Sequence, residues 1–166
     1  SGGMRQRVVI AMALICGPEL LLADEPTTAL DVTIQAQILE MIRGFKEKNN
    51  TSMILITHDL GIVAENCDTV AVIYAGQILE YGTIEDIFDH PAHPYTKGLF
   101  NSLPGAAKGE RRLHPIEGFP PDPRVIMPGC VFAPRCPYAT DRCTEAQVAD
   151  VRLSDTHRCR CILEEV

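Results

Sequence analysis

Two short apolar segments, each followed directly by acidic residues, constrain the fold more than any other feature of this sequence. Residues 19–24 read ELLLAD and residues 52–59 read SMILITHD. Apolar runs of this length are typical of strands that are buried on both faces of a parallel sheet. Between them, Ile34, Ile38, Ile42 and Phe45 recur at helical spacing within residues 32–50. This alternation predicts an α/β fold with a mainly parallel sheet.

The rest of the chain differs in periodicity and proline content from segment to segment. We expect helices over residues 1–16 and 60–67, and two strands over residues 69–82 that are joined at Ala75-Gly76. Two short helices are predicted within residues 83–105. Residues 114–129 contain five prolines and no periodicity, which indicates an extended connector.

Composition divides the chain near residue 90. Residues 1–90 carry 13 acidic and 5 basic side chains, whereas ten of the 12 prolines fall later. We therefore expect two domains, residues 1–90 and residues 91–166, the second a small irregular cysteine-rich extension. The acidic first part is a poor match for the phosphates of duplex DNA. The longest apolar run, Val8–Cys16, is far shorter than the roughly 18 residues that a membrane helix needs.

The polar residues that follow the two apolar segments are candidate site residues. Carboxyl ends of parallel strands meet at one edge of a sheet, so Asp24, Glu25 and His58 are expected to lie together. Asp24 suits Mg²⁺ beside nucleotide phosphates, Glu25 suits activation of an attacking water, and His58 suits contact with a terminal phosphate. The alternative is that the two acids only cap a strand and that His58 is a solvated loop residue.

The first residues of the chain form a candidate anion site. Gly2 and Gly3 allow close backbone approach, and the helix that begins there presents free N–H groups beside the Ser1 hydroxyl. A flexible linker is the alternative interpretation of such a short Ser-Gly-Gly segment.

Taken in order, the segments SGGMRQ, LLLADE, ALD and ITHD resemble the signature motif, Walker B strand, D-loop and switch histidine of an ABC transporter ATPase subunit. The resemblance implies an ABC-type P-loop ATPase domain that uses ATP and Mg²⁺. It implies Glu25 as catalytic base, His58 as sensor of the γ-phosphate and Asp24 as Mg²⁺ ligand. It also implies contacts across an ATPase dimer, by Ser1, Gly2, Gly3 and Gln6 to the ATP of the other subunit and by Asp31 of the D-loop.

One motif of that family does not occur in these residues. The phosphate-binding sequence G-x-x-x-x-G-K-[ST] is absent from the 166 residues, and in the family it precedes the signature. The expectation is a C-terminal fragment that does not hydrolyse ATP by itself.

The second part resembles the C-terminal extension of oligopeptide and dipeptide importers, a subfamily that includes nickel importers. This resemblance rests on residues 90–105, the proline-rich connector and the terminal cysteines. It implies a second ATPase subunit, two membrane permease subunits, an extracytoplasmic peptide-binding protein and a peripheral location on the cytoplasmic face of the inner membrane. An ABC-type ATPase that acts on nucleic acid or ribosomes, and a non-catalytic binding module, are the alternatives.

Five of the seven cysteines lie from Cys130 onward, without a C-x₂-C pair of the usual structural zinc pattern. The importer resemblance implies a [4Fe–4S] cluster held by four cysteines, with Cys159 as a bystander. Zinc bound with His157, or reduced thiols without metal, are the alternatives. Cys16 and Cys67 are expected to be core residues. The four predicted cluster ligands are Cys130, Cys136, Cys143 and Cys161.

Overall fold

The computed structural model describes residues 2–103 and 115–162, and the chain divides into two compact units, residues 1–67 and residues 68–166. This division follows packing within the chain. It lies upstream of residue 90, where the composition changes, and the domain ranges 1–90 and 91–166 stay a prediction.

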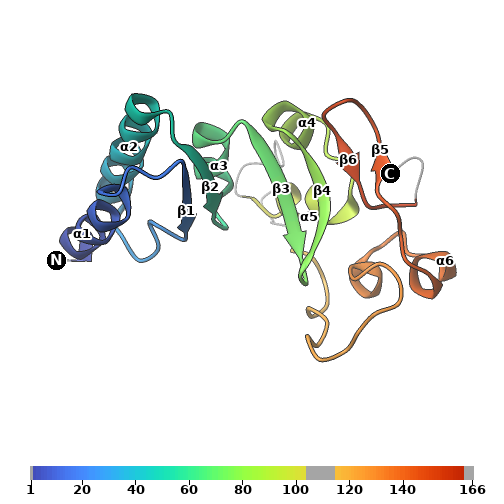
Figure 1. The fold of residues 1–166 in the computed structure, drawn as a ribbon. Helices are drawn as coiled ribbons and strands as arrows, with labels where there is room; N and C mark the ends of the chain where they lie inside the picture. The colour runs from blue at the N-terminus through green and yellow to red at the C-terminus, as the bar shows by residue number, and fades with distance from the viewer. Residues whose placement is uncertain (1, 104–114, 163–166) are drawn as a thin grey trace, which may run out of the picture. The chain divides into compact units, whose positions relative to one another are not determined.

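The first unit contains two parallel strands and three helices (Figure 1). Strand β1 pairs with β2 in parallel register from Leu20↔Ser52 to Asp24↔Ile56, as the two apolar segments predicted. The elements in chain order are α1 (Gly2–Leu14), β1 (Leu20–Asp24), α2 (Val32–Asn49), β2 (Ser52–Ile56) and α3 (Leu60–Asn66).

Helices α1 and α2 pack together and against one face of these strands. Ile10 and Leu14 of α1 meet Ile38 and Ile42 of α2, and partly buried residues of both strands adjoin this cluster. The helical spacing of the α2 isoleucines is therefore the spacing of its buried face. The other face of the strands, formed by Leu20, Leu22, Ile54 and Ile56, is exposed.

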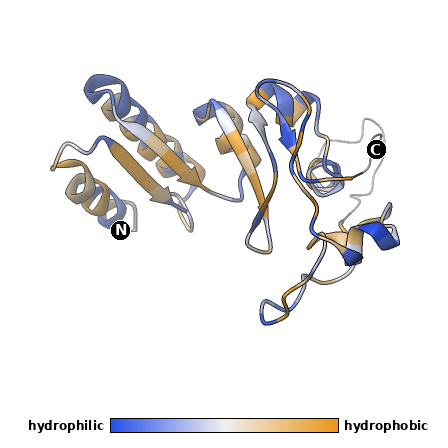
Figure 2. Ribbon diagram, turned by 45° about the vertical axis from the view of Figure 1, so that its right-hand side comes forward, coloured by the Kyte–Doolittle hydropathy of each residue, from blue (hydrophilic) through white to orange (hydrophobic). Residues whose placement is uncertain are grey.

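That exposed face corrects the expectation of burial on both faces. Figure 2 shows that β1 is hydrophobic along most of its length, yet no described element covers its second face. Three apolar residues at helical spacing within the predicted helix over residues 1–16, namely Val8, Met12 and Ile15, are exposed. Cys16 is exposed rather than a core residue, since it lies beyond the end of α1, and Cys67 is half-buried.

The second unit is built on an antiparallel sheet with strand order β3-β4-β6-β5. Strands β3 and β4 form the predicted hairpin, and the turn residues Ala75 and Gly76 have φ values of 46° and 78°, as a tight hairpin turn requires. The expectation of a mainly parallel sheet is therefore wrong for this unit. The elements are β3 (Thr69–Tyr74), β4 (Gln77–Thr83), α4 (Ile84–Asp89), α5 (Pro94–Asn101), the 3₁₀ turn η1 (Ala133–Arg135), α6 (Asp141–Glu145), β5 (Val151–Arg152) and β6 (Arg158–Cys159).

The hairpin and the chain after residue 129 share one core. Tyr74 and Leu79 of the hairpin pack with Val131 and Phe132, which follow Cys130. Strand β6 extends the same sheet by pairing with β4, with Glu80 opposite Cys159. The cysteine-containing segment is thus packed onto the hairpin rather than folded around its own residues.

None of the helices in the described part of the chain is both long and apolar enough to cross a membrane.

Candidate functional site

Glu25 lies where β1 ends and the chain turns away from the sheet. Asp24 is the last residue paired with β2, and the Glu25 N–H still donates a hydrogen bond of 2.9 Å to the Ile56 carbonyl. Glu25 has a φ of 46°, in the left-handed region that a non-glycine residue rarely adopts. This turn of the backbone sets the direction in which the Glu25 side chain leaves the main chain.

The Glu25 carboxylate is held by side chains on two loops. His58 follows β2, and its Nδ1 lies 2.8 Å from Glu25 Oε1. The Thr28 hydroxyl donates to the other oxygen, Oε2. The side chains of Glu25 and His58 are 37% and 80% exposed, so solvent reaches both groups. The structure therefore brings together the two residues that the sequence proposed as catalytic.

The contacts of this pair shift both pKa values. The hydrogen bond from Thr28, followed by that with His58, lowers the pKa of Glu25 below its usual value. The hydrogen bond to Glu25 raises the pKa of His58. Both shifts favour an ionised carboxylate, which is the form that accepts a proton.

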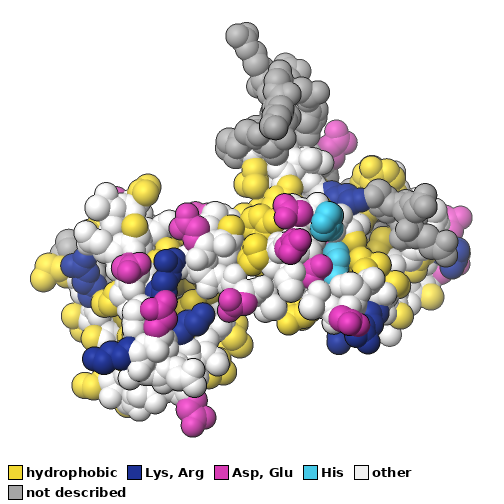
Figure 3. All heavy atoms as spheres, turned by 90° about the horizontal axis from the view of Figure 1, so that it is seen from above, with side chains coloured by type: hydrophobic (Ala, Val, Ile, Leu, Met, Phe, Trp, Pro, Cys, Tyr) yellow, Lys and Arg dark blue, Asp and Glu magenta, His cyan; other side chains and the backbone are white. Residues whose placement is uncertain are grey.

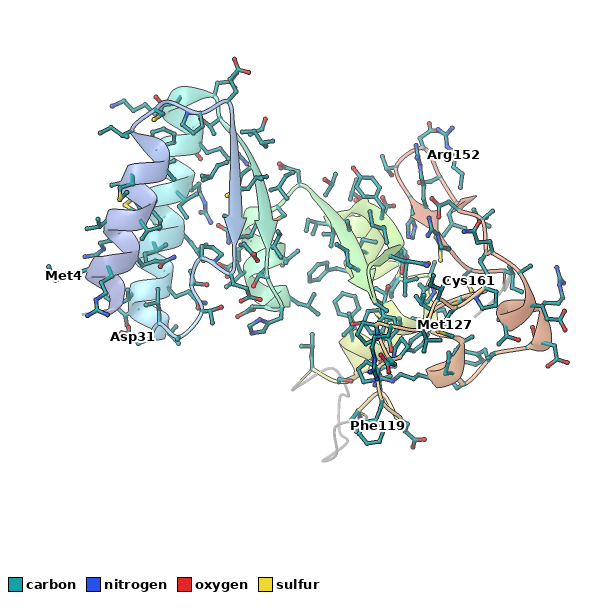
Figure 4. All side chains as sticks on the ribbon, turned by 60° about the horizontal axis from the view of Figure 1, so that its bottom comes forward. Met4, Asp31, Phe119, Met127, Arg152 and Cys161 are labelled. Carbon is teal, nitrogen blue, oxygen red and sulfur yellow. The ribbon has the colours of Figure 1, made fainter. Side chains whose placement is uncertain are left out.

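The beginning of α1 is tied to the loop that follows Glu25. The Gln6 side-chain amide donates a 2.8 Å hydrogen bond to the Pro26 carbonyl. A Cβ atom on Gly3 would lie 2.7 Å from Ile34 Cγ2, so glycine is required where α1 approaches α2. Gly2 has no such close neighbour, and Ser1 lies outside the described residues. Met4 and Asp31 mark the same end of the two helices in Figure 4.

Asp31 has a clear local role. Its Oδ1 accepts a 2.9 Å hydrogen bond from the Ile34 N–H, which makes it the N-cap of α2. The side chain is thereby fixed at the helix end, beside the loop that contains Glu25 and Thr28.

The second unit contains a small pocket of about 20 Å³ that is lined by the four predicted cluster ligands, Cys130, Cys136, Cys143 and Cys161. Apolar neighbours, among them Phe132 and Val148, complete much of its lining. Burial raises the pKa values of the Cys130 and Cys136 thiols. Cys159 is buried but is not among the lining residues.

The backbone brings the cysteine segments close together. The Cys130 N–H donates a 2.7 Å hydrogen bond to the Cys143 carbonyl. A Cβ on Gly129 would lie 2.2 Å from that carbonyl oxygen, so only glycine fits there. Among the described residues, however, no group of three or more His, Cys, Asp or Glu side chains is arranged closely enough to hold a metal ion.

A buried polar network, which the sequence did not reveal, lies beside this pocket. Glu80 is 1% exposed, and its carboxylate accepts hydrogen bonds from the N–H groups of Ala92 and His93 at 2.7 and 2.9 Å. The same carboxylate lies 2.7 Å from His157 Nε2. His157 therefore pairs with Glu80 and is not among the residues that line the thiol pocket, contrary to the zinc alternative. In the sequence, Glu80 was marked only as the one acidic residue of the predicted strand.

Comparison with known proteins agrees with this arrangement of motifs. The family model "ABC transporter" matches residues 1–28, and "Oligopeptide/dipeptide transporter, C-terminal region" matches residues 79–143. The dipeptide transport ATP-binding protein DppD of Bacillus subtilis is 55% identical over 99% of this chain and 49% of its own length. The oligopeptide transport ATP-binding protein AppD of the same organism is 53% identical over 99% of this chain and 50% of its own length.

A solved structure is similar as well. The cbiO1 protein of Clostridium perfringens, described as part of the ABC transporter complex cbiONQ, matches with a TM-score of 0.50 and 32% identity. That match covers 54% of this chain and 36% of cbiO1. The chain spans about half the length of the curated relatives named above. By its motifs, its family models and these identities, the chain is similar to ABC transporter ATP-binding proteins with the oligopeptide/dipeptide transporter C-terminal region.

Proposed function

We propose that this chain forms part of the ATP-hydrolysing subunit of an ABC importer for oligopeptides or dipeptides. The observation that carries the proposal is the 2.8 Å contact between His58 Nδ1 and Glu25 Oε1 at the carboxyl edge of the parallel strands. Open α/β sheets bind ligands at this edge, and a fixed carboxylate there suits phosphoryl transfer to water. The choice of oligopeptides or dipeptides as the transported substrate rests on the names of the relatives.

In this mechanism Glu25 acts as the general base. It takes a proton from a water molecule while the water oxygen attacks the γ-phosphorus of ATP and the bond from that phosphorus to the ADP oxygen breaks. His58 holds one carboxylate oxygen and Thr28 the other, and each oxygen keeps a second lone pair that can accept a hydrogen bond from the water. Asp24, an exposed carboxylate at the same edge, has the oxygen ligands that Mg²⁺ prefers beside phosphates.

The contacts proposed across an ATPase dimer belong to the end of the unit where α1 and α2 begin. Ser1, Gly2, Gly3 and Gln6 would approach the ATP bound by a second ATPase subunit, and Asp31 would contact that subunit. The Gln6–Pro26 hydrogen bond supports this, because it couples the α1 terminus to the Glu25 loop.

Two permease subunits and an extracytoplasmic binding protein complete the proposed complex, with this chain peripheral on the cytoplasmic face of the membrane. The test is uptake by proteoliposomes that contain the whole transporter. ATP-dependent uptake of a dipeptide or oligopeptide supports the proposal. Uptake of Ni²⁺ and no peptide would instead establish the nickel alternative.

An ATPase that acts on nucleic acid or ribosomes is less consistent with the surface charge. Figure 3 shows acidic and basic side chains interspersed on the visible face, without a continuous basic surface, and the net charge is −7. Co-purification with permease subunits supports the importer, whereas co-purification with ribosomes would overturn it.

We further propose that the thiol pocket holds a structural [4Fe–4S] cluster. Its lining provides four thiols, the donor set of such clusters, in a largely apolar surrounding. Four thiols around one zinc ion would lie within about 5 Å of each other, given Zn–S bonds of about 2.3 Å. The described residues contain no group of three or more side chains close enough to hold one metal ion.

The cluster is tested by anaerobic purification of the complete subunit. We expect iron and sulfide in equal amounts and brown protein. Cys136→Ser should remove the colour, whereas Cys159→Ser, whose thiol is buried away from the pocket, should retain it. Colourless anaerobic protein with stoichiometric zinc, or with no metal at all, contradicts the proposal.

A further inference from the structure

The loop that joins β1 to α2 holds Thr28 in a fixed place beside Glu25. The Thr28 N–H donates a hydrogen bond of 3.2 Å to the Glu25 carbonyl. The Leu30 N–H closes a second turn by donating to the Thr27 carbonyl at 3.2 Å. Thr27 is 6% exposed, so the middle of the loop is anchored in the unit. The position of the Thr28 backbone is therefore set by the loop itself.

The Thr28 side chain reaches back to the Glu25 carboxylate. Its hydroxyl donates a hydrogen bond to Oε2, while His58 lies against the other oxygen, Oε1. The terminal torsion of a glutamate side chain is broad when nothing holds the carboxylate. A hydrogen bond on each oxygen restricts this rotation, so the plane of the Glu25 carboxylate is set by the two contacts together.

The two contacts differ in how firmly the donor is placed. His58 is 80% exposed in the loop that follows β2. Thr28 has a β-branched side chain, whose χ1 torsion is stiff, on a backbone that is hydrogen-bonded to Glu25. Its hydroxyl also remains a donor whether His58 is neutral or protonated. Thr28 is thus the firmer of the two supports of the carboxylate.

We propose that Thr28 is a positioning residue for ATP hydrolysis, and that its hydroxyl orients the Glu25 carboxylate toward the attacking water. This inference rests on the function proposed above for Glu25 as the general base. Thr28 takes no proton itself and acts through Glu25. A general base must face the proton that it removes, so loss of this hydrogen bond should slow the chemical step and leave ATP binding unchanged.

Two variants remove the hydroxyl, and a third retains it. Thr28→Val keeps the branched shape and Thr28→Ala adds no methyl group, so the pair separates loss of the hydrogen bond from a change in packing. Thr28→Ser keeps the donor. Thr144→Val is the matched control in the other unit. Thr144 is also exposed, and its hydroxyl donates to an acceptor three residues earlier, the Asp141 carbonyl.

The first measurement is steady-state ATP hydrolysis by the assembled transporter. We expect kcat to fall by about tenfold in Thr28→Val and Thr28→Ala, as loss of one hydrogen bond to a charged group does, with KM for ATP unchanged. Thr28→Ser and Thr144→Val should stay within about twofold of the wild-type rate. In a Glu25→Gln background Thr28→Val should have no further effect, because the hydroxyl acts through the carboxylate.

The second measurement detects the contact without hydrolysis. In the complete subunit labelled with ¹³C at the glutamate carboxyl groups, the NMR signal of Glu25 is identified by its absence from Glu25→Gln. At neutral pH we expect this signal to move in Thr28→Val and Thr28→Ala. It should keep its position in Thr28→Ser and Thr144→Val.

The outcomes separate this inference from the proposed function. Wild-type hydrolysis by Glu25→Gln would remove Glu25 as the base, and the role of Thr28 with it. A large effect of Glu25→Gln, together with wild-type kcat in Thr28→Val and Thr28→Ala, would overturn the role of Thr28 and leave Glu25 in place. A raised KM with unchanged kcat, or a further loss of rate when Thr28→Val is added to Glu25→Gln, would also overturn it.

Discussion

At the scale of single residues, the central feature is a carboxylate that is oriented before any ligand arrives. Glu25 is fixed by His58 on one oxygen and Thr28 on the other. Parallel strands place residues at their carboxyl ends along one edge, which is why the proximity of Glu25 and His58 was predictable from the sequence. The contact from Thr28 was not, because it depends on the positive φ value at Glu25, which sequence periodicity does not encode.

The same pair predicts the titration of His58. Its pKa should lie above 6.5, and Glu25→Gln should return it toward that value, as measured by NMR of the imidazole protons. The stabilisation from His58 is present below its unfolded pKa and is lost as the pH rises through the folded pKa. The contribution of Glu25, whose pKa is lowered, is lost as the pH falls through the folded pKa. An unchanged His58 pKa in Glu25→Gln would mean that the pair does not form in solution.

At the scale of elements, the contact between α1 and α2 depends on one glycine. The Cβ added by Gly3→Ala would lie 2.7 Å from Ile34 Cγ2, on a stiff β-branched side chain. We expect Gly3→Ala to lower the free energy of unfolding by about 1–3 kcal/mol, as overpacking does. Urea denaturation measures this change.

The chain offers a matched control in α2. Gly44 is exposed in the helix interior, and a Cβ there meets nothing within 4 Å. Gly44→Ala should therefore stabilise the protein by roughly 0.5–1 kcal/mol. If Gly3→Ala stabilised the protein as Gly44→Ala does, the close approach of α1 and α2 would be wrong.

The elements themselves were predictable where their signals are local. Ala75-Gly76 between two apolar runs indicated the hairpin, and the spacing of Ile34, Ile38 and Ile42 indicated α2. Strands β5 and β6 were not predicted, because two residues each give no periodicity. They form only because β6 pairs with β4, a partner about 80 residues away in the sequence.

At the scale of the second unit, Glu80 connects three distant segments. Its carboxylate joins β4 to the N-terminus of α5 and to His157, immediately before β6. Tyr74 and Leu79 of the hairpin complete the core around Val131 and Phe132 of the cysteine segment. Long-range packing of this kind has no local sequence signature.

Removal of the Glu80 side chain should therefore destabilise this unit strongly. We expect Glu80→Ala to cost about 3–5 kcal/mol, because it leaves buried N–H groups and His157 without their partner. Glu145→Ala, at an exposed position in α6, should change stability by less than about 0.5 kcal/mol. Chemical denaturation, monitored by tyrosine fluorescence, compares the free energies of unfolding of Glu80→Ala and Glu145→Ala. Equal stability of the two variants would contradict the anchoring role of Glu80.

The central claim is that Glu25 activates the water that cleaves ATP, and ATP hydrolysis by the assembled transporter with Glu25→Gln tests it most directly. Glutamine retains the shape of the side chain but cannot take the proton, so the rate should fall by roughly 10² or more while ATP binding persists. Glu65→Gln, an exposed change on α3, should leave the rate unaltered. A Glu25→Gln transporter that hydrolyses ATP within twofold of the wild-type rate would contradict the account.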